Sequence, residues 1–502
     1  MTFPLGRRSL SFRTLSLLAA MACLVAVAAC SPTQLGADSR QATLVTDGES
    51  LIVGSGTPAE VTSRVSAALF DSAPAAVLVD ASADLSTIAD ANVPVLLIAD
   101  ASDTARTTVA AELDRLGAKT VLALGPDATA LAANLTQTIV ASPGELPELE
   151  HPDGETGTVL ITGDTGVSGI APTTLDVVSA TARAAGATLM ETASGDPREA
   201  RESVDALADI TPDRVIGIGD GLGDLQQLEA RVRAAATGVQ LPGGGQLHAD
   251  KQYIALYGHP GVPVLGVLGE QNLDASVQRA KQQAAAYEGL SDKRVVPMFE
   301  IITTVALGEP SPNGNYTNEF DPELYRPWIE RAGDEGIYVV LDLQPGRADL
   351  LDQAKKYESL LRHPHVGLAI DPEWKLRPDQ RPLQQIGQVR ADEVNRVGDW
   401  LATMTRENNL PQKLFVLHQF QTRMLPDRAQ ITTGHDELQT LIHVDGQGSQ
   451  PAKQDTWRVI LQDPPAKTVW GWKNFHDEDA PMLTPKQTMD QVDPVPVMIS
   501  YQ

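Results

Sequence analysis

The stretch VGLAIDPEW, Val366 to Trp374, is an apolar run that ends abruptly in two carboxylates, a proline and an indole. Its apolar part predicts a buried β-strand. If the strand continues to its acidic end, Asp371 and Glu373 lie on one face with Cβ atoms roughly 7 Å apart, because the side-chain period of a strand is two. The stretch therefore predicts two acidic groups where a buried strand opens into solvent.

Strand-like runs recur on both sides of this stretch, from Lys251 to the C-terminus, and helical stretches separate them. Eight βα units in about 250 residues are typical of a TIM-type (β/α)8 barrel, which predicts an α/β domain over residues 251–502. A doubly wound sheet gives similar alternation, and periodicity alone does not distinguish the two. The predicted strands are Tyr253–His259, Val295–Thr303, Gly336–Gln344, Val366–Glu373, Lys413–Phe420, Leu438–Asp445, Thr468–Phe475 and Val495–Tyr501.

A second α/β region covers residues 51–236, where short β-branched runs alternate with alanine-rich amphipathic stretches. This alternation, which includes Ala75–Asp80 and Thr120–Gly125, predicts Rossmann-like units around a parallel sheet. The Pro-, Gly- and Glu-rich connector near residues 142–156 divides the region into two halves. The run Gly243-Gly244-Gly245, within residues 237–250, indicates a flexible linker to the predicted barrel.

Part of this region carries a recognisable pattern. Residues 112–121, ELDRLGAKTV, are followed by Gly125, and the apolar run Val93–Leu97 lies upstream. The pattern resembles the end of a repeat of the cell wall-binding repeat 2 family, over roughly residues 51–130. The resemblance implies the strand and helix arrangement of these repeats and cell-wall polysaccharide as a partner.

The N-terminal segment, residues 1–29, has three arginines ahead of a short apolar core, and Cys30 follows it in the sequence VAAC. This arrangement resembles a bacterial lipoprotein signal peptide with its lipobox. The resemblance implies that the segment is removed, that Cys30 carries a lipid, and that residues 30–50 form a tether at the extracytoplasmic face of the membrane. An ordinary secretory peptide or an uncleaved anchor remains the alternative.

The chain is strongly acidic. Removal of residues 1–29 takes away three arginines and no acids, so the formal net charge changes from −26 to −29. A surface this acidic repels nucleic acids and anionic lipid headgroups, which argues against both as partners. Membrane attachment then depends on the lipid at Cys30 alone. Since the only other cysteine is Cys23, the processed chain has no internal disulfide.

The predicted barrel strands end in polar side chains. In such a barrel, the βα loops at the C-terminal ends of the strands form the pocket, and catalytic groups gather there. Ionisable groups on buried apolar strands are costly if unpaired, so they pair or face a cavity. A site is therefore predicted from Tyr257, His259, Glu300, Asp342, Gln344, Arg347, Asp371, Glu373, Trp374, His418, His443, Asp445, Trp472 and Lys473.

Gly367–Trp374 also resembles the fourth-strand motif of chitinase-like glycoside hydrolases. Glu373 falls on the proton donor of that family, and Asp371 on the aspartate that steadies the acetamido group of the substrate. Val366 and Ala369 stand where the family has two further aspartates. The resemblance implies a glycoside hydrolase-like barrel with Glu373 as general acid.

Glycoside hydrolysis needs one protonated carboxyl group and one ionised group. Because a nearby negative charge raises a carboxyl pKa, Asp371 and Glu373 are expected to hold one proton between them near neutral pH. The predicted ionised partner is Asp342, Glu300 or Asp445.

A structural interpretation of the two acids is also open. In this interpretation, Asp371 caps the loop after the strand, and Glu373 forms an ion pair with Arg347 or Lys473.

Flat aromatic faces suit sugar rings, which are apolar on one side. Such faces are expected at Trp374, Trp472 and Tyr257. Imidazole is a common zinc ligand, but the first predicted strand lacks a His-x-His pair and no carboxylate closes the last one, so the histidines are predicted to be hydrogen-bonded pocket residues without a metal or another cofactor. The other predicted binding residues are His259, Gln344, Arg347, His418, His443 and Lys473.

Together, these features predict a lipid-anchored protein of a Gram-positive-type or actinobacterial cell envelope. A wall-binding-repeat-like region would position a barrel that hydrolyses or binds an envelope glycan. Two alternatives remain open: a non-catalytic envelope scaffold or binding protein, and a solute-binding lipoprotein with lobes hinged near Gly243.

Overall fold

The computed structural model describes residues 41–502 except 90, 148 and 152–156. The predicted signal peptide, Cys30 and the first part of the tether lie outside these residues and stay predictions. Among the described residues, no helix is both long and apolar enough to cross a membrane.

Two four-stranded parallel sheets form the N-terminal α/β region, which confirms the prediction of Rossmann-like parallel sheets. The first sheet has the order β5 (Val95–Ile98), β4 (Ala75–Asp80), β6 (Thr120–Leu124), β7 (Thr138–Val140). The second has the order β2 (Leu51–Val53), β10 (Arg214–Ile218), β8 (Thr158–Thr162), β9 (Thr188–Glu191). The strand β2 precedes the first sheet in sequence but pairs with β10 of the second. A short antiparallel pair joins β1 (Thr43–Leu44) and β3 (Phe70–Ser72).

The helices of this region are amphipathic, and α1 (Pro58–Leu69) shows how the sequence specifies one. Thr57 and Glu60 form a capping box at its start. Val61 and Val65, four residues apart, lie on one face of the helix and are buried. The other helices are α2 (Asp103–Leu116), α3 (Pro126–Ala132), α4 (Thr165–Ser168), α5 (Pro172–Ala184), α6 (Arg201–Ile210) and α7 (Leu225–Ala235).

Eight parallel strands in the C-terminal part close into a barrel, which confirms the predicted (β/α)8 architecture over the doubly wound alternative. The first strand pairs with the second on one side and with the last on the other. A short antiparallel strand, β13 (Thr317–Glu319), extends the second. The barrel strands are β11 (Lys251–Gly258), β12 (Arg294–Ala306), β14 (Tyr338–Leu343), β15 (Val366–Ile370), β16 (Lys413–His418), β17 (Leu438–Val444), β18 (Val469–Asn474) and β19 (Met498–Tyr501).

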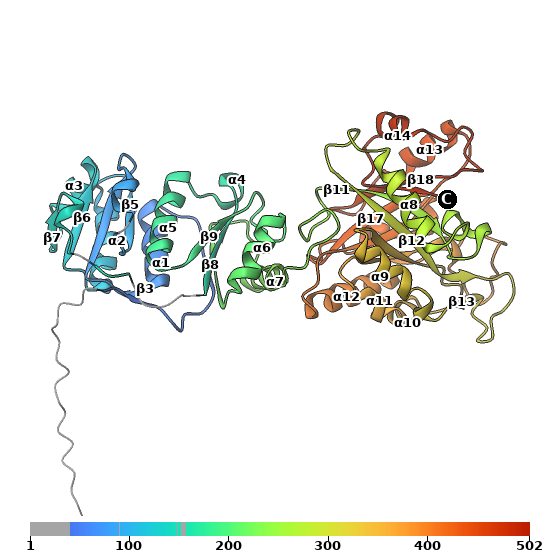
Figure 1. The fold of residues 1–502 in the computed structure, drawn as a ribbon, viewed down its shortest axis with the longest axis horizontal. Coiled ribbons are helices and arrows are strands. Elements are labelled where there is room, and N and C mark those ends of the chain that lie inside the picture. The colour runs from blue at the N-terminus through green and yellow to red at the C-terminus, as the bar shows by residue number, and fades with distance from the viewer. Residues whose placement is uncertain (1–40, 90, 148, 152–156) are drawn as a thin grey trace, which may run out of the picture. The chain divides into compact units, whose positions relative to one another are not determined.

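Alternate residues along each barrel strand enter different apolar layers, as the period of two requires. Met298 and Val340 belong to the apolar cluster inside the barrel. Phe299 and Leu341 belong to the larger core between the strands and the surrounding helices. Those helices, several of which flank the strands in Figure 1, are α8 (Leu273–Ala285), α9 (Arg326–Asp334), α10 (Leu350–Lys356), α11 (Glu358–Leu361), α12 (Ala391–Glu407), α13 (Gln450–Ile460) and α14 (Pro485–Gln491).

The opening stretch folds differently from the prediction at its acidic end. The strand β15 ends at Ile370, and Pro372–Trp374 forms a short 3-10 helix. Proline has no N–H to continue the strand ladder, and the Asp371 side chain caps the new turn. The expectation that Asp371 and Glu373 share one face of a strand is therefore wrong, because only the apolar part is extended.

Gly367 gives a test of how tightly β15 is packed. A Cβ atom there would lie 2.5 Å from the Leu414 carbonyl oxygen and 3.0 Å from the Tyr338 hydroxyl. Gly367→Ala is therefore expected to lower the free energy of unfolding by about 1–3 kcal/mol through overpacking. Because all six tryptophans lie within residues 251–502, tryptophan fluorescence in a urea titration reports the barrel. Gly308→Ala, where a Cβ would meet nothing within 4 Å, is the control, and equal losses for both variants would contradict the prediction.

Candidate functional site

Along the barrel strands, polar side chains follow the apolar residues of the barrel interior at the next positions that face inward. On β12, Glu300 follows Met298 by two residues, and on β14, Asp342 follows Val340 in the same way. The period of two keeps each pair on the same side of its strand. The same step from an interior apolar residue leads to Tyr257, Asp371, His418, His443 and Ser500, all of them buried.

A cavity of about 300 Å³ opens at this end of the barrel. It combines carboxylates, one lysine and aromatic surfaces within a single pocket. The structure brings seven of the predicted site residues to its wall: Tyr257, Gln344, Asp371, Glu373, Trp374, Asp445 and Lys473.

Glu373 lies in the 3-10 helix after β15 and is partly exposed. Burial and then repulsion from Asp445 raise the pKa of Glu373 to about 7, against the attraction of Lys473 and His418. Its backbone carbonyl accepts a hydrogen bond from the Gly387 N–H at 2.7 Å, which fixes the turn that carries the side chain. Near neutral pH, Glu373 can therefore both hold and release a proton, as a general acid must.

Asp371 stabilises this turn. Only 4% of it is exposed, and its Oδ1 accepts the Glu373 N–H at 3.1 Å. Burial raises the pKa of Asp371 well above its usual value, the charge of His418 opposes this shift, and repulsion from Asp342 and Asp445 adds to it. Asp371 therefore favours its protonated form, and its geometry suits positioning of Glu373.

Asp445 has the opposite character. Its Oδ2 lies 2.9 Å from His418 Nδ1. Burial would raise the pKa of Asp445, but the hydrogen bond and charge of His418, followed by the charge of Lys473, lower it. The pocket wall thus carries one carboxyl group whose pKa is raised, Glu373, and one whose pKa is lowered, Asp445. Such a divergence separates an acid from an ionised partner in many active sites.

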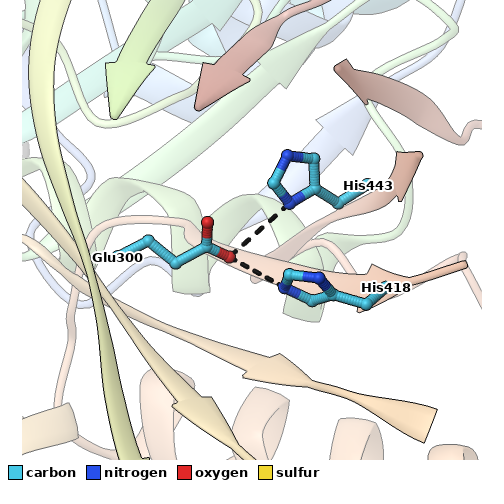
Figure 2. Close-up of side chains that lie close together, drawn as sticks. All are labelled: Glu300, His418 and His443. Carbon is cyan, nitrogen blue, oxygen red and sulfur yellow. Dashed lines mark hydrogen bonds and ion pairs between the residues drawn. The ribbon is translucent and has the colours of Figure 1, made fainter. Parts of the chain in front are cut away.

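Beneath the pocket, Glu300 and two histidines form a fully buried cluster. Figure 2 shows His418 and His443 pointing toward the same oxygen of Glu300. His418 Nε2 lies 2.9 Å from Glu300 Oε1, and His443 Nδ1 lies 3.6 Å from it. Burial would raise the pKa of Glu300, but attraction to His443 and His418 lowers it. Burial would lower the pKa of His418, but Glu300 and then Asp342 raise it well above its usual value.

Tyr257, Asp342 and Lys473 form a second buried contact beside the cluster. The Tyr257 hydroxyl donates to Asp342 Oδ2 at 2.8 Å. The Lys473 ammonium lies 3.4 Å from the centroid of the Tyr257 ring, a cation–π geometry. These contacts fix the ring of Tyr257 and hold a positive charge at the pocket wall.

Three predicted site residues lie elsewhere. His259 bonds a backbone oxygen and the Tyr325 hydroxyl. Arg347 stacks on a tyrosine ring 4.4 Å away and donates to the Gln380 carbonyl. Trp472 is buried against Trp457 in the layer under the helices. None of the three lines the cavity.

The structural interpretation of the acids finds mixed support. Asp371 does cap the turn after β15. However, among the described residues, neither Arg347 nor Lys473 forms an ion pair with Glu373. The charge of Lys473 lowers the pKa of Glu373, but burial and Asp445 raise it more.

Sequence reasoning missed aromatic residues of the pocket. Phe420 and Phe475 line the cavity, and each stands at the end of a predicted strand. A search for aromatic as well as polar strand ends would have found them. Ser500, whose hydroxyl lies 3.0 Å from His443 Nε2, carries no such signal in the sequence.

A second hollow, of about 390 Å³, lies beside β4 and α5 in the N-terminal region. Its buried acid, Asp80, already accepts hydrogen bonds from Ser82 and from the backbone N–H groups of Asp127 and Ala128. The hollow therefore offers little chemistry beyond local structure.

The raised pKa of Glu373 predicts a pH-dependent stability difference. Between pH 4.5, the ordinary glutamate value, and about pH 7, the unfolded chain ionises Glu373 while the folded chain keeps it protonated. Rising pH therefore lowers the stability of the wild type relative to Glu373→Gln across this window, and the gap is constant above it. Urea titrations at several pH values measure the gap, with exposed Glu288→Gln as the baseline. A gap that does not change with pH would contradict the environment assigned to Glu373.

Comparisons with known proteins give little beyond this geometry. No family model matches the sequence, and no curated protein matches it. Among solved structures, the chain is similar to a glycoside hydrolase family 6 enzyme from Coprinopsis cinerea, with 13% identity and a TM-score of 0.21. The match covers 55% of this chain and 69% of that chain. At this level of similarity the match does not bear on function.

Proposed function

We propose that the barrel hydrolyses a glycan of the cell envelope, with Glu373 as proton donor and Asp445 as the ionised partner. The observation that carries the proposal is the pocket itself. Glu373 and Asp445 line one cavity at the carboxyl ends of the barrel strands, and their surroundings shift their pKa values in opposite directions.

The chemistry follows from these roles. Protonated Glu373 would donate its proton to the glycosidic oxygen as the bond to the sugar breaks. Ionised Asp445 would stabilise the positive charge that develops on the sugar, either by attacking the anomeric carbon or by activating water. His418 supports Asp445 in this role by its hydrogen bond at 2.9 Å.

The pocket wall suits a sugar in two further respects. The side chains of Trp374, Phe420 and Phe475 line it and offer flat apolar surfaces for sugar rings. Gln344 and Lys473 line the same cavity and can hydrogen-bond to hydroxyl groups. A mixture of a few polar groups and aromatic surfaces is typical of small-molecule and sugar sites.

Location at the envelope is a separate part of the proposal. It is supported by the resemblance of residues 1–30 to a lipoprotein signal and of residues 51–130 to cell wall-binding repeats. Lipidated Cys30 would hold the protein at the extracytoplasmic face of the membrane. The N-terminal sheets would then bring the barrel to wall polysaccharide.

Catalysis can be tested with the full chain in detergent and fractionated envelope polysaccharides, by measuring new reducing ends. Glu373→Gln is expected to lower the rate about 10²–10⁴-fold because it removes the general acid but keeps the side-chain volume. Asp445→Asn is expected to lower it at least as much, while exposed Glu288→Gln keeps full activity.

Full activity of Glu373→Gln would overturn the assignment of the acid. Polysaccharide that binds to the wild type but is never cleaved, and binds equally well to Glu373→Gln, would instead support the non-catalytic binding protein.

Membrane attachment is tested by Cys30→Ala. Without the thiol no lipid can be attached, so the variant is expected to appear in the soluble fraction or culture medium, whereas the wild type sediments with membranes. Labelling with a radioactive fatty acid checks the cause directly. Equal membrane association of both proteins, with no label in the wild type, would contradict lipid anchoring.

A further inference from the structure

We propose that Glu300, His418 and His443 bind one divalent transition-metal ion beneath the floor of the pocket. Each residue comes from a different barrel strand, and each directs a ligand atom to one point. The three ligand atoms lie within 4.8 Å of one another, and all three side chains are fully buried.

The spacing of these atoms suits a small metal ion. Zinc bonds of about 2.0–2.1 Å in a tetrahedral arrangement separate neighbouring ligand atoms by about 3.3 Å. Glu300 Oε1 lies 2.9 Å from His418 Nε2 and 3.6 Å from His443 Nδ1. Shifts of a few tenths of an ångström would therefore bring both pairs to the distance that an ion requires. The two imidazole nitrogens, which lie within 4.8 Å of each other, would approach by up to about 1.5 Å.

The outer nitrogen of each imidazole is already held. His418 Nδ1 lies 2.9 Å from Asp445 Oδ2, and His443 Nε2 lies 3.0 Å from the Ser500 hydroxyl. Metal-binding histidines usually have such an outer partner, which fixes the ring orientation and the tautomer. Here, both rings are fixed with the remaining nitrogen toward Glu300.

A proton alone does not satisfy the cluster. An imidazolium at His418 can donate to both Glu300 and Asp445, so that ring is satisfied. However, Glu300 Oε2 and His443 Nδ1 are buried and have no hydrogen-bond partner among the described residues. Buried polar atoms of this kind are costly. Oε1 is the oxygen of Glu300 that faces both imidazoles. An ion between the three side chains would bind there and would contact His443 Nδ1, which a proton on His418 leaves unpaired.

The ligand types indicate which ions to expect. Two imidazoles and one carboxylate suit zinc or iron, whereas magnesium, calcium and manganese prefer oxygen ligands. Three protein ligands leave at least one position open, as in many sites that also hold water.

The position of the ion would give it a structural effect. Glu300 lies on β12, while His418 and His443 lie on β16 and β17, and two other strands separate β12 from β16 in the barrel order. An ion would therefore tie opposite walls of the barrel together. None of its ligands lines the cavity, so this proposal does not depend on glycan hydrolysis.

Metal binding is tested on the full chain, purified with a tag that contains no histidine and dialysed against a chelator. Addition of Zn²⁺, with Mg²⁺ as comparison, is expected to give one bound zinc per chain by elemental analysis and a higher melting temperature by tryptophan fluorescence. In place of zinc, Co²⁺ is expected to show the visible absorption of an ion with nitrogen ligands.

Variants locate the site. His443→Gln and Glu300→Gln are each expected to weaken zinc binding at least tenfold, whereas His476→Gln, at an exposed histidine of the same barrel end, leaves it unchanged. The Co²⁺ spectrum of the wild type decides the matter if both buried variants fail to fold.

Two results would overturn the proposal. One is a wild type that binds neither zinc nor cobalt at micromolar concentration. The other is equal binding by the wild type and a folded Glu300→Gln or His443→Gln variant. The readouts are metal content, spectrum and melting temperature. A negative result for metal binding therefore does not decide whether the barrel hydrolyses a glycan.

Discussion

The constraint on which the rest of this barrel depends is the burial of the Glu300 carboxylate. A carboxylate without solvent contact must have strong partners, because burying an unpaired charge costs several kcal/mol or more. Its partners, His418 and His443, arrive on strands far from β12 in the sequence. A shift of one residue in any of the three strands would turn one member of the cluster into the outer layer. The cluster therefore fixes the register of the barrel as well as its charge.

The same constraint spreads from the interior to the pocket. His418 faces Glu300 with one nitrogen and Asp445 with the other. The positive charge that stabilises Glu300 thus keeps Asp445 ionised, and ionised Asp445 in turn disfavours a second charge on Glu373. The pKa of Glu373 thus depends first on its burial and second on the charge of Asp445. This dependence explains why the carboxyl groups of the site differ although their residue types are alike.

Much of the fold could be predicted from sequence because its signal is local. Apolar β-branched runs mark the strands, and their number and spacing indicate the barrel. The acidic end of β15 differs from the prediction because Pro372 ends the strand ladder and begins a 3-10 turn, which overrides the alternation of the two acids. The N-terminal region hides a similar non-local feature, since β2 joins a sheet whose other strands begin more than a hundred residues later.

The alternating direction of side chains along a strand predicts which residues of the candidate site reach the pocket. Trp472 and Lys473 are adjacent in β18, so they face opposite layers, and only the lysine lines the pocket. Which carboxyl group keeps a proton, by contrast, depends on contacts between residues more than a hundred positions apart, such as Glu300 and His418. No spacing within the sequence contains that information.

The separation of the site into a buried cluster and a pocket wall has a consequence for evolution and for protein engineering. Glu300, His418 and His443 sit on strands, while Trp374, Phe420 and Gln447 sit after strand ends, on the loops. Loop residues tolerate exchange better than strand residues that hold a core in register. Related chains could therefore diverge in ligand while they keep the same interior, and a library aimed at a new ligand would vary the three loop positions and leave the cluster intact.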